Sequence, residues 1–114
     1  MLKNFTPHTI TIEKPDGSRL DLPSLGVIRA KVKNRPRLPV EEIPVTEVVY
    51  EEVEGVPTDL HHDDVLVVSM LARDVAIASD HPDAWRMLSP DSGPSAIRNE
   101  KGQIVAVKGL LASS

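Results

Sequence analysis

The feature that most limits the fold is the passage from an unbroken apolar run into a helical pattern near the middle of the chain. VLVVS, residues 65–69, carries no charge and is typical of a strand buried on both faces. It runs directly into MLARDVAIAS, where Leu71, Val75 and Ala78 recur at helical spacing. We therefore predict a helix over residues 69–79, with Ser69 as its N-cap and this face towards the core.

Short strands and turns are expected on both sides of this unit. Apolar and polar residues alternate around the turn signal KPDGS, which predicts a β-hairpin over residues 8–23. Further strands are expected over 27–33 and 45–53, separated by a proline-bearing loop over 34–44. Near the end, NEKG is a turn signal between strands at 96–98 and 103–110.

These elements predict an α+β fold in a single domain, residues 1–114. We expect six or seven short strands in a small curled antiparallel or mixed β-sheet or barrel, packed on one main helix. A short second helix is expected to begin at Pro82, because proline is favoured at the first helical position, and to direct Trp85 into the core.

Composition narrows the classes of function. The chain contains no cysteine, which excludes disulfides and thiolate chemistry and is most easily reconciled with a cytoplasmic protein. A net charge of −4 and only three aromatic residues make nucleic acid an unlikely partner. No apolar stretch approaches the ~18 residues of a membrane span, and no glycine-rich phosphate loop occurs. We predict no membrane association and no cofactor.

A row of alternating basic residues is the strongest charge pattern. RAKVKNRPR, residues 29–37, has a basic residue at every odd position. On a strand these charges share one face, and an antiparallel return of the acidic segment 41–54 would bring Glu47 near Lys33. Cross-strand pairing is therefore favoured over an anion site. Arg35 and Arg37, expected in the loop beyond those glutamates, are the candidates for anion contact.

Two polar segments and one helix start are candidate ligand sites. LSPDSGPSAIR, residues 88–98, is stiffened by two prolines and displays Asp91, Ser92 and Ser95. NFTPHT contributes Asn4, Thr6 and His8. Ser69 stands where free backbone N–H groups attract anions. The alternative for both segments is that their polar groups only satisfy their own turns.

Metal and catalytic sites are weakly indicated. LHHDD, residues 60–64, offers four ligand types, but adjacent residues project in divergent directions, so a solvated turn is favoured and no metal site is predicted. VSMLA lacks the glycines that surround a nucleophilic serine in hydrolases. We assign no catalytic residue, and an acid–base pair of His8 with Asp91 is the weakest alternative.

Three stretches together resemble a family of small uncharacterised bacterial, notably actinobacterial, mobile-element and phage proteins. They are NFTPHTI (4–10), EVEGVP (52–57) with VLVVSMLA (65–72), and SPDSGPSAIRNEKGQIVAVKGL (89–110). Two positions depart from the family pattern: Glu51 replaces a glycine and Leu66 a frequent tyrosine. The resemblance implies that its matching positions surround a common place on the fold, and it implies no activity. Those positions are Asn4, Thr6, His8, Ser69, Pro90 and Asp91.

Two functional hypotheses follow. The first is a non-enzymatic binding protein of phage or mobile-element type that holds a small polar, nucleotide-like ligand between the TPH segment, Ser69 and the SPDSGP loop. The second is a structural or interaction protein without a small ligand, whose sheet edges pair with another subunit in a homo-oligomer through Arg35 and Arg37 or through the acidic strand 41–54. Ligand-dependent melting and oligomeric state distinguish the two hypotheses.

Overall fold

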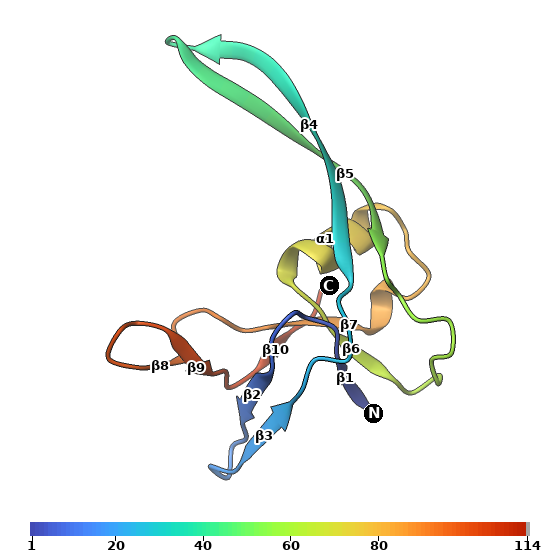
Figure 1. The fold of residues 1–114 in the computed structure, drawn as a ribbon, viewed down its shortest axis with the longest axis vertical. Helices are drawn as coiled ribbons and strands as arrows, with labels where there is room; N and C mark the ends of the chain where they lie inside the picture. The colour runs from blue at the N-terminus through green and yellow to red at the C-terminus, as the bar shows by residue number, and fades with distance from the viewer. Residues whose placement is uncertain (114) are drawn as a thin grey trace.

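The computed structural model describes residues 1–113 and confirms an α+β fold (Figure 1). Its elements are β1 (Leu2–Asn4), β2 (Ile10–Glu13), β3 (Arg19–Leu22), β4 (Arg29–Val40), β5 (Ile43–Glu54), β6 (Val65–Val67), α1 (Met70–Ala78), the 3-10 turn η1 (Ala84–Arg86), β7 (Met87–Pro90), β8 (Ile97–Arg98), β9 (Ile104–Ala106) and β10 (Leu110–Leu111). The last residue of the expected domain, Ser114, lies outside the described residues.

The body is built on a four-stranded sheet with the order β1-β6-β7-β10. β6 is parallel to both β1 and β7, whereas β10 runs antiparallel to β7. Leu66, Val67 and Val68 have no exposed surface, which confirms the prediction of a strand buried on both faces. β6, α1 and β7 thus form a strand–helix–strand unit, the connection that parallel neighbours require.

The helix has the predicted position, because Ser69 is its N-cap and accepts a hydrogen bond from the Ala72 amide at 3.1 Å. The predicted buried face was wrong in part. Ala72, Val75 and Ala76 are buried, whereas Leu71 is 46% exposed and Ala78 is also exposed. The two alanines present the smaller side chains of the helix to the strands, so the backbone of α1 can approach them closely.

Two small hairpins flank the body and follow the predicted turns. β2 pairs with β3 around the KPDGS turn, where Gly17 has a φ of 85°. β8 pairs with β9 around NEKG, where Gly102 has a φ of 78°. Glycine adopts such left-handed angles without steric penalty, so both turns form as the sequence predicts.

The largest departure from expectation is a long β-hairpin, β4–β5, which we call the arm (Figure 1). The predicted 34–44 loop is absent: β4 continues to Val40 and β5 begins at Ile43, with Glu41 and Glu42 as a two-residue turn. The arm extends from the body and dominates the 52 Å long axis of the molecule. Prolines are tolerated within it because both strands are edge strands, so no neighbouring strand needs the missing N–H groups.

Other details also differ from expectation. The described residues form four separate sheets with ten strands and no closed barrel, rather than six or seven short strands in one sheet. The expected second helix is only the turn η1, and Trp85 is 69% exposed instead of buried. Its indole lies against the Arg86 guanidinium, 4.6 Å from the ring centroid, while Met87 fills the adjacent core position. Within residues 1–113, α1 is too short and no other helix is long and apolar enough to cross a bilayer.

Candidate interaction surface

The N-terminal candidate residues form a closed hydrogen-bond network. The buried amide of Asn4 donates to the carbonyls of His8 and Leu22, both at 2.8 Å. Its carbonyl oxygen accepts from the Thr6 amide at 2.9 Å and from the Thr6 hydroxyl at 2.7 Å. All four hydrogen-bonding positions of the Asn4 side chain are therefore occupied within the chain. This arrangement corresponds to the alternative in which the polar groups satisfy their own turn.

Three candidate residues follow neighbouring parallel strands. Thr6 lies just after β1, Ser69 just after β6 and Asp91 just after β7, so the topology brings them to one edge of the central sheet. Each side chain nevertheless has a local partner. Ser69 caps α1, and Asp91 accepts from the Gly93 amide at 3.1 Å and the Ser95 hydroxyl at 3.4 Å. The three residues lie at one edge of the sheet, and their polar groups are engaged by neighbouring groups of the chain.

A hollow of about 180 Å³ lies between the N-terminal segment and the C-terminal hairpin. Thr9, Thr11, Pro90 and Ser92 line it together with residues 104–107 of β9 and its end. Ser92 is thus the candidate ligand residue that faces this hollow, and Asn4, Thr6, His8, Ser69 and Asp91 are not among its lining residues. The side chain of His8 is exposed, and the predicted common site is not formed by one cavity.

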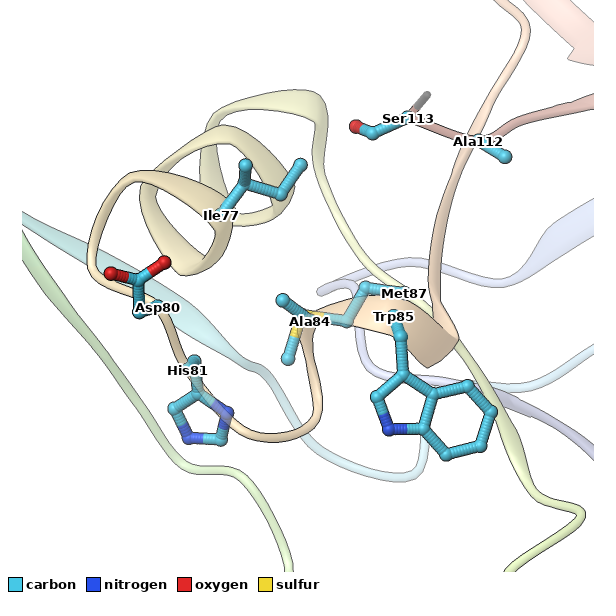
Figure 2. A pocket seen from close by; sticks show the side chains of 8 residues that line it. All are labelled: Ile77, Asp80, His81, Ala84, Trp85, Met87, Ala112 and Ser113. Carbon is cyan, nitrogen blue, oxygen red and sulfur yellow. The ribbon is translucent and has the colours of Figure 1, made fainter.

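A second hollow, of about 300 Å³, lies beyond the end of α1 (Figure 2). Figure 2 shows the side chains of His81 and Trp85 to either side of Ala84 in this view. His81 Nδ1 accepts a hydrogen bond from the Asp83 amide at 3.0 Å, which gives it a role in the turn before η1. One ring nitrogen of His81 is therefore already engaged within the turn.

The LHHDD segment contributes Asp64, which anchors the N-terminal residues. Asp64 is buried and its carboxylate lies 3.0 Å from Lys3 Nζ and 3.5 Å from the N-terminal ammonium. The Lys3 ammonium, followed by the hydrogen bond from the His61 amide, lowers the pKa of Asp64 to about 2. Among the described residues, no three potential metal ligands of the His, Asp or Glu type cluster.

One face of the arm is charged. Cross-strand partners share a face, and the pairs Arg29 with Glu54, Lys31 with Glu52 and Arg35 with Glu47 bring the basic row next to the glutamates. Ion pairs join Lys31 to Glu52 at 3.7 Å and Lys33 to Glu51 at 3.6 Å. The predicted pairing of the two strands is therefore confirmed, although its register was wrong: Arg35, not Lys33, faces Glu47. Arg35 and Arg37 lie within β4 instead of in a loop.

The opposite face of the arm carries no charge. It begins in the core, where Ala30 and Val53 face each other and pack against α1. Alternation along β4 then places three uncharged pairs on this same face, and we call this surface the uncharged face. The pairs are Val32 with Tyr50, Asn34 with Val48 and Pro36 with Thr46. Val32 is packed against the core, whereas Val48 is 54% and Tyr50 43% exposed.

The tip of the arm is also apolar. Leu38 is 88% exposed, and Val40 and Ile43, which face each other beside the turn, are both 61% exposed. Glu41 and Glu42 have φ angles of 48° and 69°, as a two-residue hairpin turn requires at both positions. Large side chains adopt such angles with strain, so this tight turn is maintained by the pairing of the two strands.

Sequence reasoning missed the uncharged face because it ended the strands at the prolines. The signal was nevertheless present: the alternation that begins at Arg29 continues unbroken to Arg37, and residues 32, 34 and 36 between the charges are uncharged. Their partners at positions 46, 48 and 50 are uncharged as well. No protein-family model, curated protein or solved structure matches this chain.

Proposed function

We propose that this chain is a non-enzymatic interaction protein that uses its arm to bind another protein surface. The observation that supports this proposal is the uncharged face, which leaves the core and continues outward with Tyr50 and Val48 exposed on it. Large exposed apolar patches are typical of protein-binding sites. The setting that the family resemblance implies, a phage or a mobile element, is part of this proposal.

The energetics of the arm favour a bound state. A two-stranded hairpin in water is marginally stable by itself, because each strand is paired on one side only and one face lacks cover. Fully burying an aliphatic side chain contributes about 1.5–3 kcal/mol. Covering Val48 and Tyr50 on the uncharged face would therefore contribute on the order of 2 kcal/mol.

The partner contacts the face of the arm in this proposal and not its edges. Pro36 and Pro39 in β4 and Pro44 in β5 remove N–H groups that a further strand would need. Irregular pairing occurs between Lys31 and Val32 and again between Arg37 and Val40, and such bulges also disrupt an edge. Both strands therefore carry the features by which natural proteins prevent edge-to-edge pairing.

Two adjacent valines allow a matched test. Val48 lies on the uncharged face, whereas Val49 faces Lys33 on the charged face. A photo-crosslinking residue placed at position 48 in producing cells should form adducts with a protein partner, and the same residue at position 49 should form few. Mass spectrometry of the adducts identifies the partner. Equal yields at both positions, or no adduct at either, would contradict the proposal.

The small-ligand hypothesis is a second candidate, supported by the hollow between Thr9 and Ser92. Its mixture of hydroxyl and aliphatic lining is suited to a small polar molecule. We expect a nucleotide that binds there to raise the melting temperature, and replacement of Ser92 by tryptophan to abolish this shift by filling the hollow. The absence of any shift across a nucleotide panel would remove this candidate.

A further inference from the structure

The geometry points to the hollow beside Trp85 as a docking site for an arginine or lysine side chain of a partner protein (Figure 2). Its described lining residues all lie outside the arm, so the inference goes beyond the proposed function and concerns a second surface. It starts from Trp85, the only tryptophan of the chain, which is 69% exposed on the turn η1. Tryptophan is among the side chains that most often dominate the binding energy of protein interfaces.

The indole of Trp85 is held in place from within the chain. The Arg86 guanidinium lies over the ring, 4.6 Å from its centroid. Arg86 is itself fixed, because its side chain is only 9% exposed, donates to the His61 carbonyl at 2.7 Å and lies 3.3 Å from the Asp83 carboxylate. One face of the indole thus rests on a fixed group, while the large exposed fraction leaves the other face in water. A side chain that is already ordered loses little conformational entropy when a partner covers it.

The charge of the hollow favours a cation. Asp80 is exposed, and it is the one Asp, Glu, Lys or Arg among the described residues that line the hollow. Asp83 is paired with Arg86, whereas Asp80 forms no ion pair with a lysine or arginine within residues 1–113. A cation is attracted both by this carboxylate and by the free face of the indole, whose π electrons are negative. An anion would meet the same carboxylate without a neutralising partner.

The rest of the lining suits the aliphatic stem of a long basic side chain. Ile77 is 40% exposed, and Ala84 and Met87 add apolar surface. Figure 2 shows Ile77, Asp80 and Trp85 around Ala84 in this view. Lysine and arginine lay their stems on apolar surface while the charged head stays with polar groups. A free small molecule fits less well, because pockets bury roughly 70–90% of such a ligand and an indole that is 69% exposed forms a low wall.

The single tryptophan makes a direct test available, because its indole N–H resonance in nitrogen-15 NMR spectra reports on this site. The probes are the peptides acetyl-Leu-Arg-Leu-amide and acetyl-Leu-Gln-Leu-amide, which differ only in the charged head and the length of the stem. We expect the arginine peptide to shift this resonance saturably at millimolar concentration and the glutamine peptide to bind about tenfold more weakly. An equal response to both peptides, or no shift with either, would overturn the inference.

Asp80→Asn tests the carboxylate at nearly constant shape. Asp80 has a φ of 54°, an angle that asparagine also adopts readily, so we expect the variant to fold. It should bind the arginine peptide about tenfold more weakly than the wild-type protein and the glutamine peptide equally. Glu100→Gln removes the same charge from the exposed turn between β8 and β9, and should bind both peptides as the wild-type protein does. Equal weakening in the two variants would refute a site at Asp80, because net charge alone would then explain the binding.

Guanidinium chloride separates a protein side chain from a free cation. At millimolar concentration we expect it to bind at least tenfold more weakly than the arginine peptide, because it lacks the stem that covers the apolar lining. Equal binding of the two would overturn the assignment to a protein side chain. Should Asp80→Asn unfold, the comparison of peptides on the wild-type protein decides. None of these variants alters the arm, so their failure leaves the proposed function standing.

Discussion

The buried asparagine near the N-terminus gives the sharpest test of how the body is held together. In Asn4→Ala, the Leu22 carbonyl and the Thr6 amide each lose the hydrogen bond from Asn4 in the buried interior, while the His8 carbonyl still accepts from the Thr6 hydroxyl at 3.0 Å. A buried polar group without a partner costs about 1–3 kcal/mol. We therefore expect Asn4→Ala to lower the free energy of unfolding by about 3 kcal/mol.

An exposed asparagine provides the matched control. Asn99 makes three side-chain hydrogen bonds, one fewer than Asn4: its carbonyl oxygen accepts from the amides of Lys101 and Gln103, and its amide donates to the Gln103 side chain. These groups are exposed, so water replaces the lost partners in Asn99→Ala. We expect this variant to lose less than about 1 kcal/mol. The comparison isolates burial as the variable, because residue type and substitution are identical.

Urea unfolding followed by far-ultraviolet circular dichroism measures both variants. With a slope of about 1.5 kcal/mol per molar urea, Asn4→Ala should move the midpoint down by about 2 M and Asn99→Ala by less than about 0.7 M. Similar shifts in the two variants would refute the assignment of Asn4 to the structural network. In that case the residue would again be a candidate for ligand contact, as the family resemblance implies.

Three further outcomes are expected from local geometry. Gly55 has a φ of 90°, and a Cβ there would stand 2.5 Å from a backbone oxygen, whereas the surroundings of Gly17 are open. Thermal melting should therefore show that Gly55→Ala destabilises the fold by more than about 2 kcal/mol and Gly17→Ala by about 1 kcal/mol. Because the folded-state pKa of Asp64 is lowered to about 2, its stabilising contribution is complete above the ordinary value of 3.8 and is lost as pH falls towards 2. The free energy of unfolding measured over this pH range should fall less in Asp64→Asn than in the wild-type protein. An equal fall in both would contradict the ion pair of Asp64 with Lys3. Replacing Glu41 and Glu42 by Asn-Gly should relieve the positive φ angles, stabilise the arm by about 1 kcal/mol and slow its amide hydrogen exchange, whereas unchanged exchange would argue against this turn.

Local patterns predicted the elements that depend on near neighbours in the chain. The helix over residues 70–78 and its Ser69 cap follow from apolar spacing and from a side chain that bonds three residues ahead. The β2–β3 hairpin follows from KPDGS, whose glycine supplies the angle that the turn needs. Each of these features is complete within a short stretch of the chain, so the sequence alone contained the necessary information.

Tertiary structure decided what depends on distant neighbours. A proline ends a central strand but not an edge strand, so the length of the arm depends on the absence of further strands beside β4 and β5, which local sequence does not reveal. The same holds for Asn4, whose amide finds the Leu22 carbonyl only because β3 returns to the N-terminal segment. The polar residues of the candidate site were therefore identified by type and position, while their partners, and the uncharged face of the arm, were fixed by how the strands meet in space.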